Sequence, residues 1–227
     1  MNRYVLALLV GMAVGLMLVA VFLFYNPFTG PNDLSPLSVT DNEVIHLSYS
    51  AVAEDTLIYT NNGESQVAPH PPKVTQLWEP AVQSTTALVT VLEDSRGQVA
   101  GIGVKFSSHS ERTNILEGKL LVDSVWHVFL PERGTLFIEQ WENFWNFVRE
   151  IVVPARWSSG DSWRGSWLSN ITAGPGALGT AWVAGGSGQF LGLNTEAVEA
   201  LSAIAYSVEQ GPVAMTGELS IEIPRSE

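Results

Sequence analysis

The stretch Thr85–Ser107, TTALVTVLEDSRGQVAGIGVKFS, decides the fold class of this chain. Its first part, Thr85–Glu93, is rich in β-branched residues, which favour strands, and Asp94–Gly97 follows as a turn. Val99–Ser107 then continues as the second strand of a hairpin, and its glycines leave room for curvature. The stretch therefore predicts an antiparallel, mainly β domain.

Further strands are expected on both sides of this hairpin. Upstream, Glu43–Tyr59 contains short apolar alternations that indicate one or two strands. Downstream, Ile115–Phe129 alternates at its end, with Trp126 on one face and His127 on the other. Near the C-terminus, Leu178–Ala184 and Leu219–Ile223 are predicted strands. Between them, residues 195–208 stay open between helix and strand, because their alanines favour a helix and their place between two glycine turns favours a strand.

The segment Phe137–Val153 breaks the β rhythm. Its apolar residues follow spacings of three and four, which predict one amphipathic helix between Gly134 and Pro154. We expect this helix to pack on a sheet or to cap a barrel mouth; the alternative is an aromatic face that touches lipid or another subunit. Glu139 and Glu142, three residues apart, are expected on or near its solvated polar face.

The N-terminal stretch Tyr4–Tyr25 carries no charged residue. At 1.5 Å per residue it gives roughly 33 Å of helix, enough to cross a hydrocarbon core of about 30 Å. Its bulky end argues against a signal peptidase site and favours an uncleaved transmembrane anchor. Arg3 before the helix and acidic residues after it predict a cytoplasmic N-terminus, with the rest exported to the periplasm of a bacterial inner membrane. Gly11 and Gly15 form a GxxxG pair that suits packing against another helix.

These patterns divide the chain into three parts. Residues 1–25 are a cytoplasmic stub and the transmembrane anchor, residues 26–42 an extended linker, and residues 43–227 a β-barrel-like periplasmic domain with one amphipathic helix.

Composition narrows the possible partners and chemistry. The chain of 227 residues has a formal net charge of −12, which disfavours binding to nucleic acid. It contains no cysteine, so disulfides, thiol catalysis and thiolate metal sites are excluded. Its four histidines show no pair at metal-ligand spacing. We therefore expect no metal and no cofactor.

Aromatic residues gather between positions 141 and 167. We interpret them as a docking surface for another protein, because exposed aromatic side chains are typical of interfaces. The predicted docking residues are Trp141, Phe144, Trp145, Trp157, Trp163 and Trp167.

One turn near the C-terminus resembles a known family. Residues 186–192, GSGQFLG, are similar to the GGTGxFxG turn of the allene oxide cyclase and dirigent-protein barrels, with Gly186, Gly188, Phe190 and Gly192 at its positions. Residues 215–219, MTGEL, contain a Thr-Gly pair where that family begins its closing strand. The resemblance covers about 50 residues and implies an eight-stranded antiparallel barrel with an apolar cavity. Because the family's cavity residues have no matching motif here, no catalytic residue is carried over.

The sequence favours a non-enzymatic accessory subunit that docks on or stabilises a larger inner-membrane protein complex. No nucleophile motif stands out. Glu139 and Glu142 could do acid–base work as a pair, but solvation is the more common explanation for such a pair. His127 is more readily a wall residue than a group in a cavity. Two alternatives stay open: a barrel that binds an apolar small molecule such as a lipid, quinone or carotenoid, and a cyclase-like enzyme.

Overall fold

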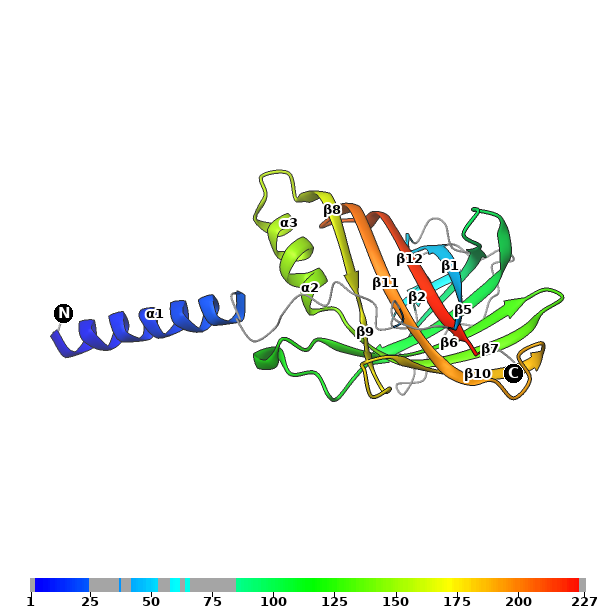
Figure 1. Cartoon of the computed structure of the whole chain (residues 1–227). Helices are drawn as coiled ribbons and strands as arrows, with labels where there is room; N and C mark the ends of the chain where they lie inside the picture. Colours follow the sequence, from blue (N-terminus) through cyan, green and yellow to red (C-terminus); the bar gives the residue numbers. More distant parts are fainter. Residues whose placement is uncertain are drawn as a thin grey trace.

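A computed structural model describes residues 3–24, 37, 42–52, 58–61, 64–65 and 85–224. These residues form an N-terminal helix, α1 (Arg3–Phe24), and one antiparallel sheet that curls into a ring (Figure 1). A mainly β fold with one long N-terminal apolar helix is therefore confirmed.

The ring is built from strands that each pair with their neighbour in the antiparallel sense. Their bounds are Glu43–Ser50 (β1), Thr86–Glu93 (β4), Val99–His109 (β5), Leu121–Leu130 (β6), Gly134–Asn143 (β7), Ala181–Gly188 (β10), Asn194–Ser207 (β11) and Gly211–Ile223 (β12). Around the ring the order is β1, β12, β11, β10, β7, β6, β5, β4 and back to β1. These eight strands match the barrel that the glycine turn implies.

Four further strands lie beside the ring. Their bounds are Ile58–Asn61 (β2), Glu64–Ser65 (β3), Ser162–Asn170 (β8) and Thr172–Gly174 (β9). The first two extend the sheet from β4, whereas β8 pairs with β11 and β9 pairs with β7. A 3₁₀ turn, Ile115–Glu117, connects β5 to β6.

The ring closes through a thin seam between β1 and β4. Ser48 and Glu93 form the one registered pair across it among the described residues. By contrast, β1 pairs with β12 along its whole length, from Glu43 opposite Ile223 to Ser50 opposite Thr216. The wall of the barrel is therefore weakest where β1 meets β4.

Alternation along the strands separates an interior from an outer face. The apolar interior contains Ile45, Leu47, Leu92, Trp126, Val128, Leu130, Leu136, Ile138, Val183, Leu219 and Ile221. Strand β5 is unusual because its larger apolar residues, Ile102 and Phe106, point outward and are 42% and 50% exposed. Its glycine face points inward, since a Cβ at Gly103 would lie 2.7 Å from the Trp126 ring.

The predicted helix over Phe137–Val153 is wrong in its first half. Strand β7 runs to Asn143, and helical structure starts only with α2 (Trp145–Phe147), followed by a π-helical segment, η4 (Val148–Val152), and α3 (Val153–Trp157). The spacing misleads because the inward face of β7 carries two polar residues, Gln140 and Glu142, both buried.

The hairpin at Thr85–Ser107 forms as expected. The carboxylate of Asp94 accepts hydrogen bonds from the backbone N–H groups of Arg96 (2.8 Å) and Gln98 (3.0 Å), which fixes the turn. Those hydrogen bonds also lower the pKa of Asp94. The open segment 195–208 proves to be strand, because it forms most of β11.

Helix α1 is apolar and long enough to cross a membrane by length and composition. Its described side chains are exposed, and in Figure 1 it stands clear of the barrel. A membrane span and a signal sequence both fit this helix. The predicted linker 26–42 lies outside the described residues, apart from the buried Leu37 and from Asn42.

Candidate active site

Inside the barrel lies a group of charged side chains that we call the buried ionic cluster: Lys105, Glu142 and Glu199. They come from β5, β7 and β11. The ammonium nitrogen of Lys105 lies 2.5 Å from Glu142 Oε1 and 2.8 Å from Glu199 Oε1. Both carboxylates are fully buried, and the lysine side chain is 9% exposed. Charged residues are rarely buried this deeply unless they are paired, and here one cation serves two acids.

Glu199 is the better-stabilised anion of the two. Its Oε2 accepts a hydrogen bond from Trp126 Nε1 (3.0 Å) and another from Gln140 Nε2, and its Oε1 accepts one from the Tyr49 hydroxyl. Burial alone raises the pKa of Glu199, but the charge of Lys105 and the hydrogen bonds from Lys105, Tyr49 and Trp126 outweigh burial and lower that pKa. Glu199 is therefore a carboxylate at neutral pH.

Glu142 is in a different state. Its Oε1 receives hydrogen bonds from Ser124 Oγ (2.5 Å) and Gln140 Nε2 (2.8 Å) in addition to Lys105. Its Oε2 is buried and has no hydrogen-bond partner among the described residues. Burial raises the pKa of Glu142 to about 7; the negative charge of Glu199 adds to the rise, and Lys105 opposes it. This carboxyl group therefore exchanges its proton near neutral pH.

The other two titratable groups of the site keep their protons. Burial lowers the pKa of Lys105, but Glu142 and Glu199 outweigh burial and raise it, so the lysine stays charged. Burial and the neighbouring Glu199 raise the pKa of Tyr49 well above its usual value. The phenol is therefore neutral and acts as a hydrogen-bond donor.

A second layer of hydrogen bonds fixes the cluster to the strands. The Thr172 hydroxyl in β9 donates to Gln140 Oε1 (3.0 Å) and accepts from the backbone N–H of Glu199 (2.7 Å). Tyr49 also packs edge-on against Trp126, with ring centroids 4.9 Å apart. The site is thus pre-organised by residues whose own positions are fixed.

This arrangement suits proton transfer. Two buried carboxyl groups that share one lysine and have separated pKa values show the pattern of an acid–base pair, in which one group titrates and the other stays charged. Glu142 is the group that exchanges the proton, and its Oε2 has no hydrogen-bond partner among the described residues.

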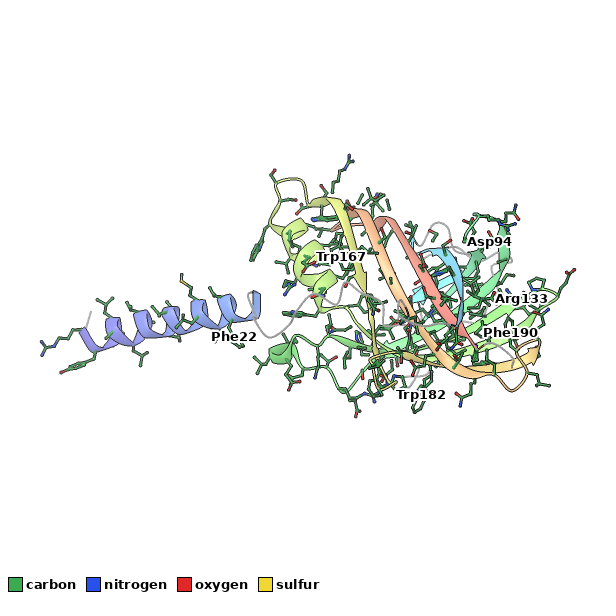
Figure 2. All side chains as sticks on the ribbon, viewed as in Figure 1. Phe22, Asp94, Arg133, Trp167, Trp182 and Phe190 are labelled. Carbon is green, nitrogen blue, oxygen red and sulfur yellow. The ribbon has the colours of Figure 1, made fainter. Side chains whose placement is uncertain are left out.

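Most residues singled out in the sequence lie elsewhere. Gly11 and Gly15 are on α1, where a Cβ would meet nothing within 4 Å. In the turn motif, Gly188 and Gly192 adopt positive φ (62° and 77°). Phe190 of the same motif is buried, and the Arg133 guanidinium lies 5.2 Å from its ring centre, at the end of the barrel opposite the helices (Figure 2).

The predicted docking residues differ in exposure. Trp167 is buried and donates from Nε1 to Glu150 Oε2 (2.8 Å), beneath the helical layer (Figure 2). Trp141 is covered by the Arg112 guanidinium, 3.9 Å from its ring centre. Trp157 is 78% exposed. Three others, Phe144, Trp145 and Trp163, are half-buried. Docking through these residues remains a prediction.

Neither His127 nor His46 forms a catalytic site. His127 is exposed on the outer face and stacks on Phe137, with centroids 4.5 Å apart. His46 lies near Glu218 (2.8 Å) and Ser220 (3.1 Å), but both contact its Nδ1. A serine–histidine–acid relay needs the two ring nitrogens on different partners. Within the described residues, no three His, Asp or Glu side chains are placed to hold a metal ion.

The sequence reading missed Lys105, Glu199 and Tyr49 and placed Glu142 in solvent. The sequence did contain a signal, which is the face of the strand on which each charged residue falls. In VAGIGVKFS, Lys105 alternates with Gly101 and Gly103. In β11, Glu199 is the one charged residue on the face that it shares with Ala197 and Leu201, whereas Glu196 falls on the opposite face. A lone charge on the inward parity of a strand indicates a buried ionic group.

The fold defines a class, that of small antiparallel barrels closed by eight strands. Among solved structures, the chain is similar to the exo-specific intermolecular Diels-Alderase AbnU, with 15% identity over 78% of this chain and 98% of that one. It is also similar to a nonspecific heme-binding cyclase that catalyses [4 + 2] cycloaddition during neoabyssomicin biosynthesis, and to the Diels-Alderase AbmU from Streptomyces koyangensis. Each of these is 11% identical over 89% of this chain, and the match covers 78% and 80% of theirs.

The TM-score of all three matches is 0.34, so the chemistry of this chain has to be argued from its own residues. No protein-family model matches the chain, and no curated protein matches its sequence.

The expectation of a non-enzymatic accessory subunit is wrong in its premise. It rested on a missing catalytic set, whereas the barrel holds two buried carboxyl groups of separated pKa. The three solved structures are described as cyclases or Diels-Alderases. The buried carboxyl groups agree better with the alternative of a cyclase-like barrel.

Proposed function

We propose that this chain is an enzyme that rearranges an uncharged small molecule by acid–base chemistry inside its barrel, as an isomerase or cyclase does. The observation that carries the proposal is the Glu142 carboxyl group, which is fully buried, has a pKa of about 7 and has an Oε2 without a hydrogen-bond partner in the described part of the chain. An unpartnered polar atom inside a barrel costs about 1–3 kcal/mol, a cost that a bound substrate would remove.

The roles follow from the protonation states. Protonated Glu142 donates the proton on Oε2 to an electron-rich atom of the substrate, and the resulting carboxylate takes a proton back from a neighbouring position. The net reaction moves bonds without gain or loss of protons, so it needs no co-reactant. Lys105 stabilises the carboxylate while it is charged, and Glu199 keeps Lys105 protonated.

The resemblance of residues 186–192 to the allene oxide cyclase and dirigent barrels supports this reaction class, and membership in that family is part of the proposal. We further propose that α1 anchors the enzyme in an inner membrane with its N-terminus in the cytoplasm and the barrel in the periplasm. The apolar length of α1 and Arg3 before it support this placement. Other membrane subunits would then contact the exposed Trp157.

The test compares Glu142→Gln with a matched control on the same strand, Glu139→Gln. Glu139 is exposed on the outer face, three residues earlier in β7. Full-length protein in detergent is incubated with a small-molecule extract of its source cells, and liquid chromatography coupled to mass spectrometry follows every compound, so that isomers of equal mass are separated by retention time. We expect one compound to be converted to an isomer of equal mass by the wild type and by Glu139→Gln, but not by Glu142→Gln. Equal conversion by Glu142→Gln would refute the proposal.

The other alternative, a barrel that carries an apolar molecule without changing it, gives a different result in the same experiment. A carrier would retain a compound through purification and release it with unchanged structure, and Glu142→Gln would alter only the amount bound.

A further inference from the structure

A cavity of about 590 Å³ lies at the seam of the barrel. Ser48–Glu93 is the one registered pair between β1 and β4 among the described residues, and the cavity lies beside this pair, along the end of β1 and the C-terminal half of β4. The hairpin of β11 and β12 completes its wall. We call this space the seam cavity; it is lined by Ser48, Tyr49, Ser50, Val52, Thr90, Val91, Glu93, Ser202, Ile204, Val213, Ala214, Met215 and Thr216.

Tyr49 links the seam cavity to the buried ionic cluster. Tyr49 lines the cavity, and its hydroxyl donates to Glu199 inside the barrel. The ring fits there because its partner in β12 is Gly217, where a Cβ would collide with the ring atoms of Tyr49. One residue, itself only 4% exposed, therefore both lines the cavity and holds the carboxylate that binds Lys105.

The lining of the seam cavity indicates what it can bind. Hydroxyl groups come from Ser48, Ser50, Thr90, Ser202 and Thr216, and the rest is mainly apolar. The described lining contains one carboxylate, Glu93, and no lysine, arginine or histidine. Inside the barrel, Lys105 is already bound by two carboxylates. An anionic ligand would therefore meet repulsion without a cation to offset it.

We propose that the seam cavity is the entrance and outer binding site for an uncharged, oxygen-bearing and largely apolar molecule. The inference rests on the proposed function, because it assigns the substrate class and the route to the same buried carboxyl groups. Serine and threonine hydroxyls bind the oxygen atoms of the ligand, and the valine and isoleucine side chains contact its hydrocarbon part.

The chain has no cysteine, so single cysteines report on this route without background. Thr90→Cys places a thiol on the seam cavity, where Thr90 is 1% exposed. Ala181→Cys is the matched buried control, because Ala181 faces the interior with 0% exposure and does not line the cavity. Ser95→Cys, in the exposed turn after β4, gives the reference rate for free access.

Each variant of the full-length protein is treated with methyl methanethiosulfonate, which is neutral, and with its sulfonatoethyl analogue, which is anionic. We expect Thr90→Cys to react with the neutral reagent at least tenfold faster than Ala181→Cys. Relative to Ser95→Cys, we expect the anionic reagent to modify Thr90→Cys at least tenfold more slowly than the neutral one. Equal rates at Thr90→Cys and Ala181→Cys would show that the seam is closed, and equal relative rates for both reagents would overturn the charge selectivity.

Occupancy is tested with two probes of equal chain length, 2-decanone and decanoate. We expect 2-decanone to slow the modification of Thr90→Cys several-fold and decanoate to leave it unchanged. Protection by decanoate alone would overturn the assignment of an uncharged ligand. Neither the labelling rate nor its protection requires catalytic turnover. If Thr90→Cys is labelled and 2-decanone protects it, but the protein converts no compound, the entrance is supported and the proposed reaction is not.

Discussion

At the residue scale, the state of Glu142 determines how stability depends on pH. An unfolded glutamate titrates near 4.5, whereas the pKa of folded Glu142 is about 7. The folded protein therefore binds this proton more tightly, and the resulting stabilisation is complete below pH 4.5 and is lost as the pH rises to 7.

We expect the free energy of unfolding of the wild type to fall by up to about 1 kcal/mol per pH unit between pH 5 and 7 relative to Glu142→Gln. Urea titrations of both proteins at pH 5, 6, 7 and 8 measure this difference. Parallel pH profiles for the two proteins would show that Glu142 titrates as it does in the unfolded chain.

Lys105 offers a second test at this scale. Lys105→Met leaves two carboxyl groups buried side by side without a cation, and we expect a loss of about 3–5 kcal/mol of stability. Lys119→Met removes the exposed pair with Glu117 and should cost far less, because water screens a surface ion pair. Thermal unfolding of both variants gives the comparison; similar midpoints would mean that the buried ionic cluster contributes no more than a surface pair.

The cluster was hard to predict because its members are far apart in the chain. Glu199 lies 94 residues after Lys105 and 150 after Tyr49, so no spacing rule connects them. The barrel topology brings them together, and topology did not follow from the local patterns. The sequence could have indicated the cluster only through the position of each charged residue on the inward face of its strand.

At the scale of elements, β7 shows why hydrophobic periodicity failed. Strands of this barrel normally place apolar residues inside, and β4 and β6 were predicted well because they do. In β7 the inward positions Gln140 and Glu142 are polar and the outward positions Phe137 and Trp141 are aromatic. The functional residues reverse the pattern that identifies the strand.

The turn that joins β6 to β7 gives an element-scale prediction. Gly134 has φ of 129°, and a Cβ there would collide with the backbone of Ser187 in β10. Gly211 also has positive φ (78°), but a Cβ there would meet nothing within 4 Å. Gly211→Ala should therefore cost about 1 kcal/mol from backbone strain alone, and Gly134→Ala at least twice as much.

Chemical denaturation of the two glycine variants measures this difference. Equal losses of stability would mean that β6, β7 and β10 move apart at little cost, and that the barrel wall is softer there than its packing indicates.

At the scale of the whole molecule, α1 determines whether the barrel stays attached to a membrane. If α1 is an anchor, the mature protein keeps residues 1–25, sediments with membranes and needs detergent for release. Intact-mass measurement of protein from its native source checks this directly. A mature chain that begins after residue 25 and stays in solution would identify α1 as a signal sequence.

The ionic cluster also constrains how the chain folds. The meander from β4 to β7 can form early, since its strands are neighbours in sequence, and it already unites Lys105 with Glu142. Glu199 arrives only with the C-terminal strands, so a half-formed barrel would lack one of the two acids that its lysine requires. An incomplete cluster of this kind is costly to bury, so the meander gains its full stability only when the last strands dock. We therefore expect the meander and the C-terminal strands to be lost together, in a single cooperative unfolding transition.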